Sequence, residues 1–175
     1  MTPLQKVAMG LVIVFLSARF AGYDALADPV GWGLVVAGLL PLRRTLPLGG
    51  TALTLAVLAG LVAVPLVLPA LDERLAASGQ WGASLPQTAF CVVLCGSLCT
   101  LADRAGAKEA GRFGLLRWVF VAVALGPVLV YGGRVDALAA PVAVVAVLAN
   151  VALVSYTFAV SRRTWSRTPE PAPAG

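Results

Sequence analysis

Three cysteines are the first residues in this chain whose type and spacing could support chemistry. Cys91, Cys95 and Cys99 follow one another at intervals of four residues, so a helix would place all three on one face. Thiolates bind copper or zinc, but three along one helix extend over about 12 Å, and the chain has no histidine to complete a site. The C-x-x-C spacing of redox dithiols is also absent. We therefore expect no metal and no cofactor here, and instead a stripe of small side chains that lets a neighbouring helix approach.

Two carboxylates and an arginine form the second candidate group. Asp24 and Asp28 are one turn apart if their segment is helical, and Arg19 precedes them. Such a group could bind a divalent cation or an amine at the outer face, although two carboxylates are too few for a metal-dependent phosphotransferase site. The alternative is that the carboxylates cap a helix and solvate its end. The three residues remain a candidate outer-face polar site, and no catalytic residue is assigned.

Asn150 is the costliest polar residue of the apolar segments. It lies near the middle of the last one, residues 137–161, where an amide needs a hydrogen-bonding partner. A bond to a neighbouring helix is the favoured role, and contact with a pore or substrate is the alternative. No charged side chain lies at mid-depth in any apolar segment, whereas ion-coupled carriers usually place one there.

The elements that must position these residues are strongly apolar. Of 175 residues, 59% are hydrophobic and 12% are charged, against about 45–50% and about 25% in soluble domains. A globule of this length buries only about 70% of its chain surface, so the composition excludes a soluble protein. The net charge of +5 comes from basic residues in short loops, where they orient helices in a bilayer and do not indicate nucleic-acid binding.

Six charge-poor segments predict an all-α bundle of six transmembrane helices in a single domain, residues 1–163. The second segment has 14 charge-free residues, which cover about 21 Å of a hydrocarbon core of about 30 Å. A re-entrant or interfacial helix there, with five full spans, is the alternative. A Pro/Ala-rich tail, residues 164–175, is expected to be disordered and cytoplasmic. The predicted helices lie near residues 4–20, 29–43, 51–71, 85–102, 113–132 and 136–161.

Small residues and a proline predict local features of two of these helices. Ala52, Ala56 and Gly60 recur at four-residue spacing and form a small-residue face on the third helix. The pair Gly126-Pro127 predicts a kink in the fifth helix.

The basic residues are distributed unevenly between the two sides of the bundle. With six spans, ten Lys and Arg share one side and three share the other. The side with ten is expected to be cytoplasmic, together with the C-terminus. Omitting the second span also gives ten against three, so the side of the N-terminus stays open. In the six-span arrangement the ten are Lys6, Arg43, Arg44, Arg104, Lys108, Arg112, Arg117, Arg162, Arg163 and Arg167.

A heptapeptide occurs twice. Residues 24–30 recur as residues 136–142, an offset of 112, with six of seven positions identical. Each copy carries an Asp suited to a helix N-cap and a Pro suited to the first turn. The copies are either two similar helix starts in an Ala-rich chain or the mark of a parallel repeat of helical hairpins.

The segment from Asp24 to Leu39 resembles a phrase of small uncharacterised multipass membrane proteins of bacteria. In that phrase an Asp-x-Leu-Pro-Asp-x-x-Gly-aromatic run opens a short apolar helix that contains a later Gly-Leu. Here Ala27 stands in place of the proline, and the match covers about a tenth of the chain. The resemblance implies a protein of the bacterial inner membrane and assigns no reaction. The matching residues are Asp24, Leu26, Asp28, Gly31, Trp32, Gly38 and Leu39.

These observations favour a non-enzymatic integral membrane protein that acts as a subunit, scaffold or regulator in a membrane complex. Its expected surroundings are the lipid bilayer and a membrane-protein partner or a second copy of the chain, with no nucleic acid. The repeated heptapeptide and Asn150 suggest the alternative, a transporter or channel for a small solute that acts alone or as an oligomer. A third interpretation is an intramembrane enzyme that uses the outer-face carboxylates.

Overall fold

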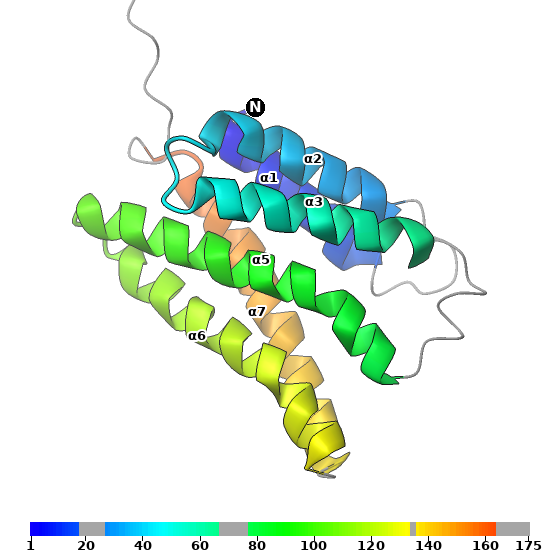
Figure 1. Cartoon of the computed structure of the whole chain (residues 1–175). Helices are drawn as coiled ribbons and strands as arrows, with labels where there is room; N and C mark the ends of the chain where they lie inside the picture. Colours follow the sequence, from blue (N-terminus) through cyan, green and yellow to red (C-terminus); the bar gives the residue numbers. More distant parts are fainter. Residues whose placement is uncertain (18–26, 67–76, 134–135, 164–175) are drawn as a thin grey trace, which may run out of the picture.

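The computed structural model describes residues 1–17, 27–66, 77–133 and 136–163, and six α-helices make up most of this part of the chain (Figure 1). The predicted all-α bundle of six helices is confirmed, and no strand occurs in the residues described. A π-helical turn η1 (Val128–Gly132) continues the fifth helix, and a 3-10 turn η2 (Asp136–Leu138) precedes the sixth. The helices are α1 (Pro3–Ser17), α2 (Ala27–Leu42), α3 (Gly49–Leu66), α5 (Ala77–Arg104), α6 (Glu109–Pro127) and α7 (Ala139–Val160).

The helices pack in the order in which they follow one another along the chain. Each contacts the next, and α7 contacts α1, so that the six form a closed ring. In Figure 1, α1, α2 and α3 lie together above α5 and α6, and α7 runs behind them. The start of α1, the end of α2 and the end of α7 lie toward the same, left-hand end of that view.

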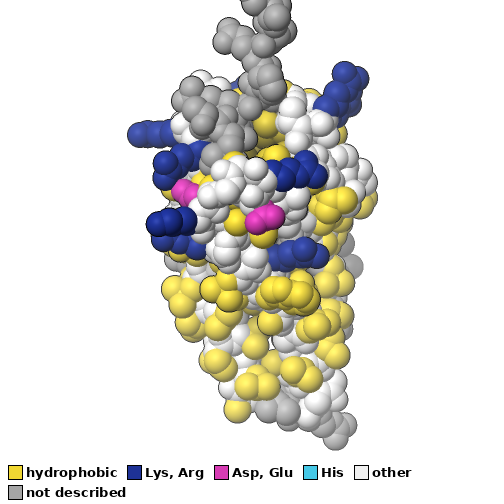
Figure 2. All heavy atoms as spheres, turned by 90° about the vertical axis from the view of Figure 1, so that its left-hand side faces the viewer, with side chains coloured by type: hydrophobic (Ala, Val, Ile, Leu, Met, Phe, Trp, Pro, Cys, Tyr) yellow, Lys and Arg dark blue, Asp and Glu magenta, His cyan; other side chains and the backbone are white. Residues whose placement is uncertain are grey.

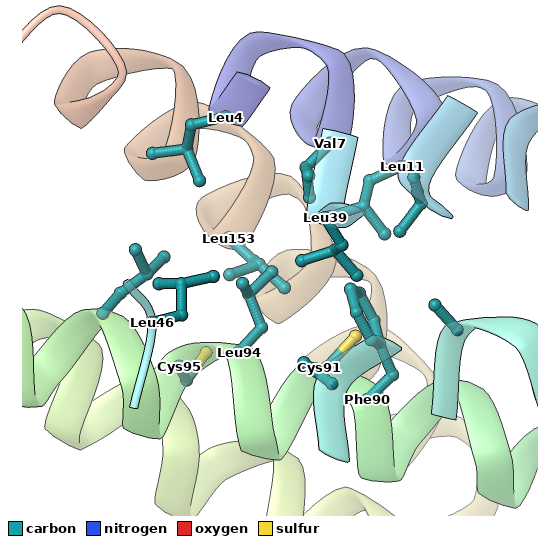
Figure 3. Close-up of a cluster of buried hydrophobic side chains, with 14 of the residues drawn as sticks. Leu4, Val7, Leu11, Leu39, Leu46, Phe90, Cys91, Leu94, Cys95 and Leu153 are labelled. Atoms are coloured by element: carbon teal, nitrogen blue, oxygen red, sulfur yellow. The ribbon is translucent and has the colours of Figure 1, made fainter. Parts of the chain in front are cut away.

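The interior of the ring is filled with apolar side chains (Figure 3). At its centre Trp32 of α2 meets Phe90 of α5 edge to face, with ring centroids 5.4 Å apart. Ala52 and Ala56 of the predicted small-residue face on α3 are fully buried. The side chains labelled in the figure come from α1, α2, the α2–α3 connection, α5 and α7, and are Leu4, Val7, Leu11, Leu39, Leu46, Phe90, Cys91, Leu94, Cys95 and Leu153.

Helices α1 and α2 form an antiparallel hairpin that only glycine permits. A Cβ at Gly10 of α1 would lie 2.5 Å from the carbonyl oxygen of Gly31. A Cβ at Gly38 of α2 would lie 2.7 Å from the carbonyl oxygen of Pro3. Because both obstacles are backbone atoms, a side chain at either position would have to push the helices apart. In a bilayer the lipid tails are as apolar as the helix side chains, so helices associate through close backbone approach of this kind.

Three helical stretches have the length and composition needed to cross a membrane: Trp81–Arg104, Glu109–Val130 and Ala139–Val160. With 22 or 24 residues each, they extend over about 33 Å or more, against a hydrocarbon core of about 30 Å. The other described apolar helices, in α1, α2 and α3, are shorter. These long helices expose many large apolar side chains, and such a surface suits a lipid environment. On α6 and α7 it includes Leu115, Trp118, Leu125, Val144, Leu148 and Val151.

The basic side chains gather at one end of the bundle (Figure 2). Arg43 and Arg44 follow α2, and Arg162 and Arg163 follow α7. An ion pair joins two helix ends there, because Arg163 Nη2 lies 3.1 Å from Glu109 Oε1 at the start of α6. Of the ten basic residues that the six-helix arrangement assigns to this end, Arg167 is outside the described residues, and Arg117 lies about two turns inside α6, with its side chain beside Gly96 of α5. The other eight lie in the first or last turn of a helix or next to it.

Two prolines lie where the sequence signals place them, but the predicted Asp N-cap is wrong for α7: its N-cap is Leu138, without a side-chain cap hydrogen bond, because the 3-10 turn η2 with Asp136 precedes the helix. The α-helical part of α6 ends at Pro127 and continues as the π-helical turn η1, at the site of the predicted kink. In the repeated heptapeptide, α2 begins at Ala27 and α7 at Ala139, which are equivalent positions. Each copy therefore places its proline third in a helix, where the missing N–H costs nothing.

Candidate functional site

The predicted outer-face polar site lies largely outside the described residues, which include neither Arg19 nor Asp24. Asp28 is half-buried in the first turn of α2, and its Oδ1 atom is buried. A carboxylate at this position is favoured by the helix dipole. The position of Asp28 therefore fits a role at the helix start, and the three-residue site stays a prediction.

The three cysteines of α5 lie at two different contacts. Cys91 and Cys95 are buried in the core, where Figure 3 shows them on the same helix as Phe90 and Leu94. Cys99 is half-buried against α6, and its Sγ lies 3.3 Å from the carbonyl oxygen of Ala110. Among the residues described, no three His, Cys, Asp or Glu side chains are grouped so that they could hold a metal ion. The thiols pack as small side chains between helices.

Asn150 lies half-buried in the middle of α7. It follows Ala146 by four residues and Ala143 by seven, so the three side chains share one side of the helix. Its amide forms no hydrogen bond with another described residue. The expected bond to a neighbouring helix is therefore not seen within that part of the chain.

A pocket of about 220 Å³ lies beside this side of α7, at the end of the bundle opposite the basic residues. The start of α5, the end of α6 and the start of α7 form its walls, which are mainly apolar. Pro127 lies in the α6 wall, next to the π-helical turn, and such turns often accompany functional sites. The α5 wall consists of Trp81, Ser84 and Thr88, and the α7 wall of Ala139, Val142, Ala143 and Ala146.

The polar groups of this pocket already donate hydrogen bonds within the protein. Trp81 Nε1 donates to the carbonyl oxygen of Ala124 on α6 at 3.2 Å. Ser84 Oγ donates to the Trp81 carbonyl at 2.8 Å, and Thr88 Oγ1 donates to the Ser84 carbonyl at 3.1 Å. None of the described residues that line the pocket is charged. The pocket therefore suits an apolar or weakly polar occupant and has no group arranged as an acid, base or activated nucleophile.

The sequence did not predict this pocket because it depends on where α5 begins. The helix starts at Ala77 instead of near residue 85, which adds the turns that carry Trp81 and Ser84. These turns are held by the indole bond to Ala124, a contact between residues 43 positions apart. The only local signal was Trp81 itself, an aromatic residue with a donor that needs a partner when partly buried.

The fold and the pocket define an all-α helix bundle with three helices able to cross a membrane and a small apolar pocket between them. No protein-family model, curated protein or solved structure matches the chain.

Proposed function

We propose that the protein is a non-enzymatic membrane subunit, scaffold or regulator that holds a transmembrane helix of a partner against α5, α6 and α7. The uneven burial of the three long helices is the observation that carries this proposal. Within its apolar window, 44% of α5 is buried inside the chain, but only 17% of α7 is. Helix α7 therefore has most of its surface available for another membrane-embedded surface.

The face of α7 beside the pocket has the composition of a helix-packing surface. Ala139 and Ala143 are exposed and Ala146 is half-buried, so a partner helix could approach the backbone closely. In lipid, small residues at this spacing support helix association through van der Waals contact. The adjoining pocket could receive a side chain of the partner. The described residues that line the pocket are uncharged, which supports a role in helix packing.

The proposed topology is a multipass protein of the bacterial inner membrane, with all six helices crossing and the basic end in the cytoplasm. Support comes from the basic side chains at one end (Figure 2) and from the antiparallel pairing of α2 with α1 along its length. Positive charge concentrates on the cytoplasmic side of membrane proteins. The C-terminus then lies inside the cell.

Labelling of single cysteines in intact cells tests this topology. In a background without Cys91, Cys95 and Cys99, Ala137→Cys and Arg44→Cys place a thiol at exposed positions at opposite ends of the bundle. A membrane-impermeant maleimide should label Ala137→Cys in intact cells and Arg44→Cys only after permeabilisation. If only Arg44→Cys were labelled in intact cells, the basic end would lie outside the cell, and the proposed orientation would be wrong.

A photoreactive amino acid at Ala143 tests the partner-binding face. It should form a discrete adduct with another membrane protein, whose mass identifies either a partner or a second copy of the chain. The control is the same amino acid at Leu61, an exposed position on α3, which should give only lipid adducts. Equal adducts at both positions, or none at Ala143, would contradict the proposal.

A small-solute transporter is the second candidate, because Asn150 follows Ala146 of the pocket wall by one helical turn. A solute flux in proteoliposomes that Asn150→Leu abolishes would favour this function over the first.

A further inference from the structure

Arg117 is the charged residue of the three long helices that lies furthest from a helix end. It follows Glu109, the first residue of α6, by eight positions, which places it about 12 Å along the helix from the basic end of the bundle. Its side chain is exposed. A cation at this depth is costly in hydrocarbon unless an anionic or polar group accompanies it.

The Arg117 side chain crosses from α6 to α5 and lies against Gly96. A Cβ at Gly96 would lie 3.6 Å from Arg117 Cδ and 3.7 Å from its Nε and Nη1, and these are the three atoms nearest to it. Gly96 precedes Arg104, the last residue of α5, by eight positions, so the guanidinium has the same depth on both helices. The glycine thus leaves room for the guanidinium at the surface of the α5–α6 contact.

No acidic side chain among the described residues neutralises this charge. Arg117 forms no ion pair or hydrogen bond within the part of the chain that the structure describes. Glu109 is paired with Arg163 at 3.1 Å. Asp103 lies seven positions beyond Gly96 on α5, about 10 Å along the helix. The guanidinium of Arg117 is therefore available to a bound anion.

The neighbours of Arg117 along α6 place it where a bilayer changes from headgroups to acyl chains. Leu115 and Trp118 are both exposed. Tryptophan concentrates at the membrane interface, where its ring lies at the level of the headgroups, and an exposed leucine suits acyl chains. Figure 2 shows basic side chains that border an apolar surface on one face of the molecule. A lipid phosphate can therefore reach the guanidinium from the basic end, with its acyl chains along the apolar surface of α6.

The other charges at this end of α5 and α6 favour an anionic lipid. Arg104 and Lys108 are exposed at the helix ends, closer to the membrane surface than Arg117. Arg112 lies over the Tyr156 ring, 5.6 Å from its centroid. A guanidinium binds phosphate through charge-assisted hydrogen bonds, and basic clusters at the membrane surface attract lipids with a net negative charge.

We propose that the phosphate of an anionic phospholipid binds the Arg117 guanidinium where it lies over Gly96, at the surface of the α5–α6 contact. The bound lipid neutralises the deepest charge of the long helices and fixes the depth of α5 and α6 in the bilayer. This inference depends on the proposed membrane placement of the basic end. It does not depend on a partner at α7, so either proposal can fail without the other.

Native mass spectrometry of the full chain in mild detergent tests the site with phosphatidylglycerol and, as a probe without net charge, phosphatidylcholine. The wild-type protein should retain phosphatidylglycerol preferentially, and excess inorganic phosphate should not displace it. Arg117→Gln should weaken phosphatidylglycerol binding about tenfold, the loss expected for a hydrogen bond to a charged group. The matched control Arg44→Gln removes the same charge from an exposed position at the same end of the bundle, and it should change binding less than about twofold.

A second pair of variants displaces the guanidinium without changing the charge. Gly96→Leu fills the space that the Arg117 side chain occupies, because the three atoms nearest to its Cβ belong to that side chain. It should lower phosphatidylglycerol binding toward the level of Arg117→Gln and leave the helical circular dichroism signal of lipid-free protein unchanged. Gly111→Leu is the control, because a Cβ there would meet no atom within 4 Å, and it should bind as the wild type does.

Several results would overturn the proposal. They are equal losses in Arg117→Gln and Arg44→Gln, equal retention of the two lipids, displacement by inorganic phosphate, and unchanged binding in Gly96→Leu. A membrane protein that purifies with the chain and is released by Arg117→Gln, with lipid binding unchanged, would also overturn it and would assign the guanidinium to a carboxylate of that partner.

Discussion

Replacing Gly38 with leucine is expected to force α1 and α2 apart and to lower the free energy of unfolding by about 3 kcal/mol, near the upper end of overpacking costs. A Cβ at this position would lie 2.7 Å from the carbonyl oxygen of Pro3 and 2.9 Å from the backbone nitrogen of Val7. Because both atoms belong to the backbone of α1, no side-chain rotation can relieve the contact. Unfolding by SDS titrated into mild-detergent micelles, followed by circular dichroism, measures the change.

Gly33 provides the matched control on the same helix. A Cβ there would meet no atom within 4 Å, and the residue is exposed. Gly33→Leu should leave the unfolding free energy unchanged or raise it by up to about 1 kcal/mol, because leucine is a better helix former than glycine. Equal destabilisation by Gly33→Leu and Gly38→Leu would show that the close α1–α2 contact at Gly38 does not determine the stability of the hairpin.

The number and type of elements could be predicted from sequence because a bilayer leaves few choices. A long charge-free run in lipid must satisfy its own backbone, and a helix does so within one segment. The small-residue face of α3 could be predicted for a related reason. Spacing of four places Ala52, Ala56 and Gly60 on one side, and the structure buries both alanines and brings Gly60 close to Trp32.

Contacts between distant segments could not be predicted in the same way. The glycines of α1 and α2 are recognisable as small, but nothing local shows that Gly10 meets Gly31 or that Gly38 meets Pro3. Only the packed hairpin shows it. The same holds for the contact between α7 and α1, which closes the ring over almost the whole length of the chain.

The features of the candidate site residues could likewise be predicted only where they depend on spacing along one helix. Cysteine spacing was sufficient to place three thiols on one helix, but not to show that Cys99 would turn to Ala110 of α6 while Cys91 enters the core. Asn150 could be identified as costly because its amide lies deep in an apolar segment. Its position one turn from the pocket depends on where Trp81 and the extra turns of α5 pack, which is a tertiary property.

Phe90→Ala is expected to produce the largest loss of stability of any substitution considered, about 3–5 kcal/mol. Phe90 is fully buried at the centre of the ring and packs edge to face against Trp32. Its removal leaves a cavity whose walls belong to different helices, so no single side chain can fill it. The emission of Trp32, in a variant whose other tryptophans are replaced by phenylalanine, should also shift to the red as the indole loses this contact.

Trp118→Ala is the control, because Trp118 is 69% exposed on α6 and its loss should cost less than about 0.5 kcal/mol. If the two variants unfolded at the same SDS concentration, the Phe90 cluster would not be the core that holds the ring together.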